Sequence, residues 1–425
     1  MTLTRSAIAG AFIALATATA AATSAQAQTF TYIGQQIVPT GQRFAGTTIG
    51  GLSGIDRDTV SGRYLAISDD RSAVNPARFY ELSLDLAQFR RSANPGQAGV
   101  TFNAATTILR PDGSAYATGT LDPESLRINP TTGALVWSNE GQRGGAGVPA
   151  LQNPSVREMT RAGGFTRDYA VPTRFNPTGT SGAGIGATDP GIRNNLAFES
   201  LTFSTDGTLL YTATENSLVQ DGTPATLTTG SPSRIVAFDA RTGAAGTEYA
   251  YNVERVALAP AAASGFNTNG LVELLATGDR QFIALERSFA AGAATAGVGP
   301  NGLPTGNTIR LYAVDARGAT DVSSFDLSSG AAYTAVSKTL LLDLSTLTND
   351  DGSALALDNI EGITWGAELN GQRTLVLVSD NNFGAGQFTQ FVALSVSPAI
   401  PEPGTWALMI GGVALLGLRR RRSPA

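Results

Sequence analysis

Three stretches of the chain share one frame: DPESLRI at Asp122–Ile128, AFESLTF at Ala197–Phe203 and NIEGITW at Asn359–Trp365. Each has a glutamate, a small residue, an aliphatic residue, a variable residue and then an apolar residue. Two further stretches fit less well: LSGI at Leu52–Ile55 has serine in place of the glutamate, and LVEL at Leu271–Leu274 is a poorer copy. The small or equivalent positions, 54, 125, 200, 273 and 362, are spaced 71, 75, 73 and 89 residues apart. This period indicates a repeated supersecondary unit.

Each copy of the frame is followed by further β-strand patterns. Alternating or β-branched segments such as Arg63–Ser68, Thr208–Thr214 and Arg373–Ser379 are separated by turns such as Ser204–Gly207. Three or four antiparallel strands repeated in this way are typical of propeller blades, whereas a β-sandwich would not need the repeated glutamate frame. We predict an all-β fold, a β-propeller of five to six blades. A sixth blade would lie in the long loops or be completed by a Thr29–Val38 strand that pairs with the C-terminal strand.

The chain of 425 residues contains no histidine and no cysteine. The absence of these residues excludes a Ser-His-Asp triad, a thiol nucleophile, a disulfide framework and an imidazole- or thiolate-ligated zinc site. Any catalysis must therefore use carboxylates, hydroxyls, arginine, tyrosine, the single lysine Lys338, or a hard metal ion held by oxygen atoms.

The two ends of the chain have the character of targeting segments. Residues 1–27 are predicted to be a signal peptide for signal peptidase, with Arg5 before an apolar stretch and a small-residue cleavage site at Ala25–Ala27. The last segment, 399–425, has Pro401–Pro403, an apolar run and four closing arginines. It resembles a PEP-CTERM sorting signal. The domain between them is predicted to span residues 28–398.

The PEP-CTERM resemblance implies a route out of the cytoplasm. It implies export through the inner membrane, anchoring there by a C-terminal transmembrane helix, and handling by exosortase-type sorting machinery. The apolar run Trp406–Leu418 would be that helix, and the arginines would keep the tail on the cytoplasmic side. After cleavage near the Pro-Glu-Pro sequence, the protein would be at the cell surface or extracellular.

The charge of the body, residues 28–400, is about −9, from 24 basic and 33 acidic residues. This charge argues against a nucleic-acid partner, because such binding depends on basic contacts to phosphates. It suits a protein that collects cations.

Three pairs of acidic residues have spacings that a β-hairpin would bring together. Two pairs are 16 residues apart and the third is 19 apart; they are Glu124 with Glu140, Glu199 with Glu215, and Glu361 with Asp380. A hairpin with its turn near the midpoint places the two members of a pair side by side at its open end. Radial repetition then gathers the pairs, and carboxylates so close repel one another unless a cation neutralises them.

Calcium is the natural cation for such a group, because it takes six to eight oxygen ligands. The predicted metal ligands are Asp69, Asp70, Glu124, Glu140, Glu199, Glu215, Glu361 and Asp380. Arg71 and Arg143, like Arg287, closely follow acids at strand ends, and we predict Arg71 and Arg143 as catalytic phosphate clamps. The alternative is purely structural: acids that accept backbone hydrogen bonds from a neighbouring blade, and arginines that pair with those acids.

The motifs Glu124-Ser-Leu, Glu199-Ser-Leu and Asn359-Ile-Glu-Gly-Ile, with their strand endings, resemble the phytase-like family named for an "esterase-like activity of phytase". The resemblance covers about residues 46–395. It implies a propeller and, by analogy with calcium-dependent propeller phytases, hydrolysis of phosphomonoesters. A shared fold does not by itself establish that activity.

Three functions are consistent with these features. The first is calcium-dependent hydrolysis of a phosphorylated substrate, in which bound metal activates water. The second is a propeller lactonase or esterase that uses a divalent ion against a carbonyl group. The third is a non-catalytic, calcium-stabilised module that binds a polymer or another ligand at the cell surface or in the extracellular matrix.

Overall fold

The computed structural model describes residues 29–144, 151–179 and 189–397. The predicted signal peptide and the predicted sorting segment lie outside these residues. Within them, no helix is long and apolar enough to cross a membrane. The transmembrane helix expected from the sequence falls in 399–425 and so stays a prediction.

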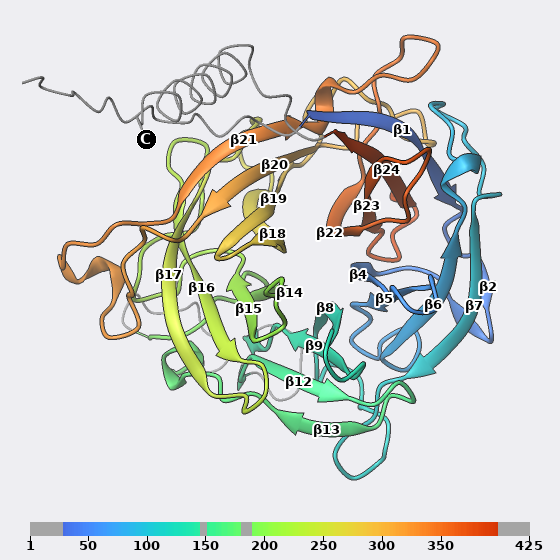
Figure 1. Ribbon diagram of the computed structural model, residues 1–425. Helices are drawn as coiled ribbons and strands as arrows, with labels where there is room; N and C mark the ends of the chain where they lie inside the picture. Colours follow the sequence, from blue (N-terminus) through green and yellow to red (C-terminus); the bar gives the residue numbers. More distant parts are fainter. Residues whose placement is uncertain (1–28, 145–150, 180–188, 398–425) are drawn as a thin grey trace, which may run out of the picture. The chain divides into compact units, whose positions relative to one another are not determined.

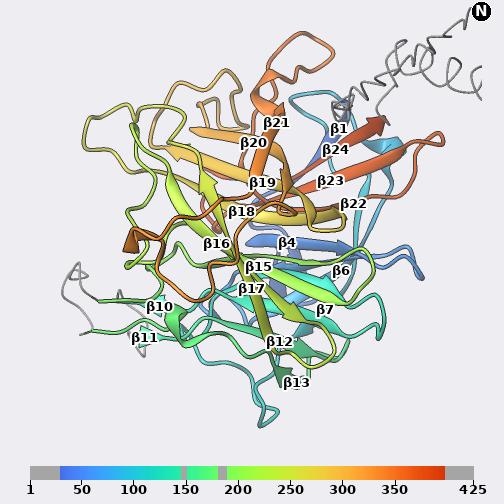
Figure 2. The ribbon, with the colours of Figure 1, turned by 60° about the vertical axis from the view of Figure 1, so that its left-hand side comes forward.

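Five four-stranded antiparallel sheets surround a central axis, as Figures 1 and 2 show. Blade 1 consists of β4 (Leu52–Arg57), β5 (Tyr64–Ser68), β6 (Arg78–Leu84) and β7 (Val100–Thr107). Blade 2 consists of β8 (Pro123–Ile128), β9 (Leu135–Asn139), β12 (Ser155–Met159) and β13 (Phe165–Asp168). Blade 3 consists of β14 (Phe198–Phe203), β15 (Leu209–Thr214), β16 (Ser231–Asp239) and β17 (Ala245–Val253). The all-β propeller predicted from the repeats is confirmed.

Blade 4 consists of β18 (Asn267–Gly278), β19 (Gln281–Ala290), β20 (Asn307–Asp315) and β21 (Ser337–Asp343). Blade 5 consists of β22 (Asn359–Trp365), β23 (Arg373–Asp380), β24 (Thr389–Ser397) and β1 (Thr29–Val38). The remaining elements are short: β2 (Arg43–Phe44), β3 (Thr47–Thr48), β10 (Gln142–Arg143), β11 (Leu151–Gln152), η1 (Leu86–Gln88), η2 (Thr173–Phe175), η3 (Leu327–Ser329) and η4 (Leu344–Thr346).

The first strand of the described chain closes the ring. Strand β1 pairs antiparallel with β24, from Thr29 opposite Ser397 to Val38 opposite Thr389. The sequence predicts this pairing of Thr29–Val38 with the C-terminal strand as one way to complete a sixth blade. The pairing is present, but it belongs to the fifth blade, and the described residues form no sixth one.

Hydrophobic clusters join neighbouring blades. Each of five buried clusters draws its side chains from two adjacent sheets; for example, Val272 and Leu285 of blade 4 share a cluster with Ile363 and Leu375 of blade 5. The strands near the axis are consequently buried on both faces. This explains why their sequences read as short, nearly continuous apolar runs rather than as strict alternation.

In each blade, the strand nearest the axis is called the inner strand; these are β4, β8, β14, β18 and β22. Every inner strand has a β-bulge at the same position of the repeat. The pairing register with the second strand shifts at the residue in the glutamate position of the frame. In the five blades these residues are Ser53, Glu124, Glu199, Val272 and Glu361. A bulge inserts one extra residue and redirects the side chains next to it. Glu273 therefore lies at the small-residue position of blade 4, one residue after the bulge.

One arginine, Arg127, lies at the axis beside the residues that follow the bulges. The guanidinium of Arg127 donates hydrogen bonds to five carbonyl oxygens, one from the equivalent position of each inner strand: Ile55, Leu126, Leu201, Leu274 and Ile363. Its Nη2 also lies 2.9 Å from Oε2 of Glu273, which is fully buried. Glu273 in turn accepts hydrogen bonds from the Ser125 hydroxyl at 2.8 Å and the Leu201 amide at 2.9 Å.

We predict that Arg127→Met lowers the free energy of unfolding by about 3–5 kcal/mol, because it leaves Glu273 buried without its counterion. Urea denaturation measures the change. The matched control is Arg161→Met, because Arg161 makes a 3.0 Å ion pair with Asp58 but is exposed; we expect that variant to lose less than about 1 kcal/mol. Equal losses in the two variants would contradict a special role for the axial arginine.

Candidate metal centre

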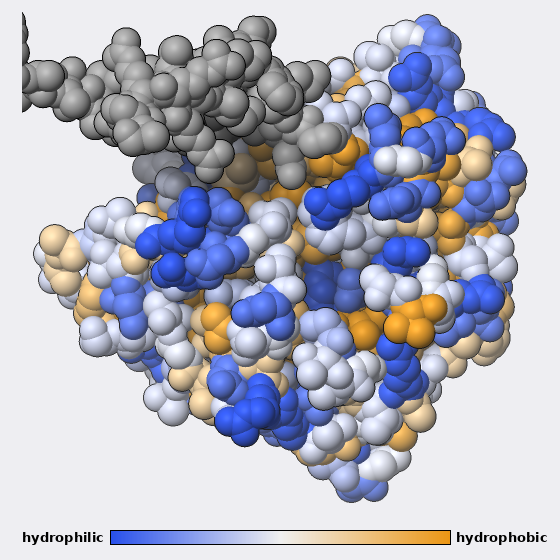
Figure 3. All heavy atoms as spheres, in the orientation of Figure 1, coloured by the Kyte–Doolittle hydropathy of each residue, from blue (hydrophilic) through white to orange (hydrophobic). Residues whose placement is uncertain are grey.

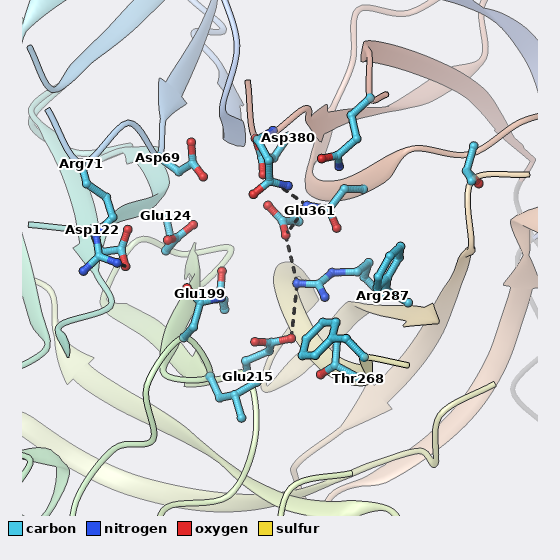
Figure 4. Close-up of a pocket in the computed structure, with 18 of the residues that line it drawn as sticks. Asp69, Arg71, Asp122, Glu124, Glu199, Glu215, Thr268, Arg287, Glu361 and Asp380 are labelled. Atoms are coloured by element: carbon cyan, nitrogen blue, oxygen red, sulfur yellow. Dashed lines mark hydrogen bonds and ion pairs between the residues drawn. The ribbon is translucent and has the colours of Figure 1, made fainter. Parts of the chain in front are cut away.

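Acidic side chains from four blades converge near the axis (Figure 4). Glu124, Glu199 and Glu361 come from the inner strands of blades 2, 3 and 5. The second strand of each hairpin supplies another acid where it ends, and the first blade contributes one as well. These four residues are Asp69, Glu140, Glu215 and Asp380.

The hairpin pairing predicted from the spacings is confirmed. The Glu140 amide donates to the Asp122 carbonyl at 2.9 Å, and the Glu215 amide donates to the Ala197 carbonyl at 2.6 Å. Asp380 lies opposite Asn359 in the register of β22 and β23. Each pair of acids is thus at the open end of its own hairpin.

Two groups of three carboxylates are close enough to share ions. One oxygen each of Asp122, Glu124 and Glu140 lies within 4.8 Å of the others, and the same holds for Glu140, Glu199 and Glu215. All five side chains are buried. Glu140 belongs to both groups and therefore links them into one continuous acidic cluster that could bind metal.

Burial opposes ionisation throughout this cluster. Loss of hydration raises the pKa of Asp122 and that of Glu215 to about 7. It raises the pKa of Glu124, Glu140 and Glu199 well above the ordinary range of glutamate, with neighbouring carboxylates as a further cause. The cluster therefore favours protons or bound cations, which reduce the repulsion between its carboxylates.

Two arginines face the acids without neutralising them all. Nη2 of Arg287 lies 3.4 Å from Oε1 of Glu215 and 3.0 Å from Oε1 of Glu361, so it bridges blades 3 and 5. Nη1 of Arg71 lies 3.4 Å from Oδ2 of Asp122, and this guanidinium is about one-third exposed. The pairs with Arg287 follow the dashed lines in Figure 4.

Two carboxylate oxygens lack protein partners. Among the described residues, no donor forms a hydrogen bond with Oε2 of Glu140 or with Oε2 of Glu215, and Oε1 of Glu215 has only the ion pair with Arg287 at 3.4 Å. Native proteins rarely leave buried polar atoms unsatisfied, so such atoms point to an ion or water. Oxygen atoms alone line the two groups, and such ligands suit a hard cation such as Ca²⁺.

Glycines make room for two of the acids. A methyl group on Gly270 of β18 would lie 2.1 Å from Cγ of Glu215, and one on Gly51 would lie 2.0 Å from Oδ1 of Asp69. Gly51 also has a φ of +64°, which favours glycine. The contact of Gly270 with Glu215 crosses from blade 4 to blade 3, so Glu215 depends on a neighbour far away in the sequence, whereas Gly51 and Asp69 belong to the same hairpin of blade 1.

The structure does not bring two of the predicted site residues into the cluster. Asp70 points away from the axis, where it forms a 2.7 Å ion pair with Arg78 and caps the loop amides of Ala73, Val74 and Asn75. Its side chain faces the opposite way from that of Asp69 because successive residues of an extended chain alternate in direction.

Arg143 is likewise engaged in a structural role. Its buried guanidinium donates to the carbonyl oxygens of Thr178, Pro190 and Ile192, and so it holds a loop between blades 2 and 3. It is absent from the described residues that line the axial pocket.

Sequence reasoning missed two residues that belong to the site. Asp122 is a member of the first carboxylate group, and Asn359 donates to Glu361 at 3.0 Å and to Asp380 at 3.2 Å. Both stand two residues before the repeat's glutamate. A signal existed, because residues i and i+2 of a strand lie on the same face.

Four acids of the cluster line a pocket of about 520 Å³, namely Asp122, Glu124, Glu199 and Glu215. Figure 3 shows a recess lined by hydrophilic residues near the centre of this face. Asp69, Glu361 and Asp380 also line the pocket, together with polar residues and two aromatic side chains of the rim.

Comparison with solved structures finds matches of low similarity. They include a structure titled "Structure of Dos1 propeller", with 8% identity over 83% of this chain and 69% of that chain and a TM-score of 0.33. A GH43 β-1,3-galactosidase has 13% identity over 84% and 59% of the two chains, with a TM-score of 0.40. A xylan β-1,4-xylosidase from Bacillus halodurans C-125 has 13% identity over 82% and 52%, with the same TM-score of 0.40. The present chain thus spans little more than half the length of the two glycosidases.

No match is found among curated proteins. Two family descriptions match the sequence. The PEP-CTERM protein-sorting motif matches residues 399–423, which implies export and sorting to the cell surface. The description "Esterase-like activity of phytase" matches residues 47–383, which contain almost all of the five blades and every acid of the cluster. The chain therefore belongs to the phytase-like family.

Proposed function

We propose that this exported protein is a calcium-dependent hydrolase of phosphoesters. The observation that carries the proposal is the pair of three-carboxylate groups joined through Glu140, beside a pocket. Within these groups, Oε2 of Glu140 and Oε2 of Glu215 are buried and have no partner among the described residues. Glu140 also has a structural contact, because its Oε1 accepts a hydrogen bond from the Ala197 amide of blade 3 at 2.7 Å. A structural role does not account for its Oε2 or for Oε2 of Glu215, which have no hydrogen-bond donor among the described residues, whereas both oxygens of Glu273 do.

The chain's own residues divide the work of such a site. Asp122, Glu124, Glu140, Glu199 and Glu215 would hold the calcium ions, and Asp69, Glu361 and Asp380 line the same pocket. When bound, calcium supplies positive charge against a phosphoryl group and lowers the pKa of a coordinated water.

The arginines have different roles in this proposal. Arg71, with its partly exposed guanidinium, orients the phosphoryl group of the substrate. Arg287 holds Glu215 and Glu361 in place from between them, and Asn359 orients Glu361 and Asp380. Arg71 remains a candidate catalytic residue, whereas Arg287 and Asn359 are positioning residues.

The location of the protein follows the sorting motif. We propose that a helix over Trp406–Leu418 anchors the chain in the inner membrane, and that exosortase-type machinery then cuts near Pro401–Pro403. The cluster would then work in calcium-containing surroundings outside the cytoplasm.

We predict that the isosteric change Glu140→Gln lowers calcium affinity about 10- to 100-fold, because Glu140 serves both carboxylate groups. Hydrolysis of p-nitrophenyl phosphate should fall to the level seen with a chelator. Calorimetry and a colorimetric assay give the two readouts. The control is Glu158→Gln, which removes an acid that pairs with Arg167 on an outer strand of blade 2.

The same assays separate the other candidate functions. Turnover of lactones but not of phosphoesters or phytate would replace phosphoester hydrolysis by carboxylic-ester hydrolysis at the same metal centre. If the chelator lowers the melting temperature while no substrate is turned over, the protein is a calcium-stabilised binding module instead.

Gly270→Ala tests the cluster without removing a ligand. The added methyl group would displace Glu215, so we expect weaker calcium binding by about tenfold or more while the propeller stays folded, as circular dichroism would show. Gly246→Ala on β17 is the matched control, because the nearest atom to its methyl group is 3.6 Å away. Unchanged calcium affinity in Gly270→Ala would remove Glu215 from the proposed ligands.

The pH dependence of stability should differ between metal-free and calcium-loaded protein. The pKa of Asp122 and of Glu215 is about 7 in the folded chain, compared with about 4 for unfolded carboxyl groups. Between these values the folded chain binds more protons than the unfolded one, so its stability falls as the pH rises.

We therefore expect the melting temperature of chelator-treated protein to fall between pH 5.5 and pH 8.5. Excess calcium should remove this decline, because the ions take the place of the protons. Differential scanning fluorimetry across the pH series checks both statements, and a decline that calcium leaves unchanged would argue against metal in the cluster.

A further inference from the structure

One side of the pocket rim is apolar. Phe266, directly before β18, lines the pocket with 67% of its surface exposed. The ring of Phe289, on β19, lies beside it with a centroid distance of 6.1 Å and an interplanar angle of 38°. Phe266 is a member of none of the hydrophobic clusters formed by the described residues. Core packing therefore does not explain why a phenylalanine stands at the mouth of an acidic pocket.

The pocket is also poor in cationic side chains. Among the described residues that line it, only Arg71 and Arg287 are positively charged, and both already face carboxylates. The chain's single lysine is elsewhere: Lys338 lies between the rings of Tyr251 and Tyr312 and pairs with Glu286 at 2.6 Å. Polyanions are recognised by groups of arginines and lysines, and this pocket offers no such group.

We propose that the pocket selects esters in which one phosphoryl group is joined to an aromatic group, and that Phe266 is the residue that determines this specificity. The inference rests on the proposed function, because the phosphoryl group would be held by the metal centre. The aromatic group of the substrate packs on the exposed face of Phe266, in the offset or tilted arrangement that aromatic pairs prefer. Substrates with many phosphates, such as phytate, lack the apolar group, and beyond the metal centre the described lining offers them only Arg71 and Arg287 as cationic side chains.

Two phosphonates that are not hydrolysed test the proposal by binding alone. Phenylphosphonate and methylphosphonate carry the same anionic group, and only the first has a ring. We expect calcium-loaded protein to bind phenylphosphonate about tenfold more tightly in isothermal titration calorimetry. Phe266→Ala should reduce the affinity for phenylphosphonate to that for methylphosphonate and leave the latter unchanged.

Two control variants make the test specific. Phe266→Tyr keeps the ring and should keep the preference. Val60→Ala removes another exposed apolar side chain, one that is 95% exposed in the turn between β4 and β5, at the far end of that hairpin; it should change neither affinity. Because Phe266 and Val60 are both exposed, neither substitution is expected to unfold the protein.

The outcomes separate the inference from the proposed function. Equal affinities for the two phosphonates in the wild type, or a preference that survives in Phe266→Ala, would overturn the role of Phe266 while leaving the metal centre in place. If neither phosphonate binds the calcium-loaded protein, the phosphoester proposal fails and the specificity fails with it. In steady-state assays, a higher kcat/KM for phytate than for phenyl phosphate would also overturn the inference.

Discussion

The Arg127 guanidinium sets the level at which the five blades meet. It donates to the same carbonyl position of every inner strand, so a shift of one blade along the axis would break a buried hydrogen bond. The carboxylate of Glu273 compensates the positive charge of the Arg127 guanidinium. Because the inner strands are held in register with one another, their bulges also lie at one level, and the glutamates there meet across the axis.

The two levels of the axis differ in how charge is compensated. Around Arg127 and Glu273, one cation meets one anion and the remaining donors and acceptors are paired. Around the bulges, eight carboxylates face two arginines. The interblade clusters hold the strands in place, so the acids cannot relax outward. The fold thus maintains an excess of negative charge in a buried place, and a bound cation is the simplest way to balance it.

Local regularity explains what the sequence alone could predict. The repeated frame and the hairpin spacings predicted the blades and six acids of the cluster, because these depend on periodicity within one blade. Contacts between blades are not visible in the sequence. The role of Glu273 as counterion, the space that Gly270 leaves for Glu215 and the engagement of Arg143 by a distant loop all depend on such contacts. Asp69 and Asp70 are adjacent in the sequence, but their side chains point in opposite directions after β5. Asp69 lines the pocket, whereas Asp70 forms the ion pair with Arg78.

The central claim is that cations occupy the axial cluster, and the metal content of the folded protein tests it most directly. Inductively coupled plasma mass spectrometry of the purified protein after exhaustive exchange into metal-free buffer gives the stoichiometry. The account predicts at least one equivalent of calcium per chain, removed only by a strong chelator and regained when calcium is added. A chain that stays folded without bound metal at neutral pH, and takes up none from millimolar calcium, would contradict it.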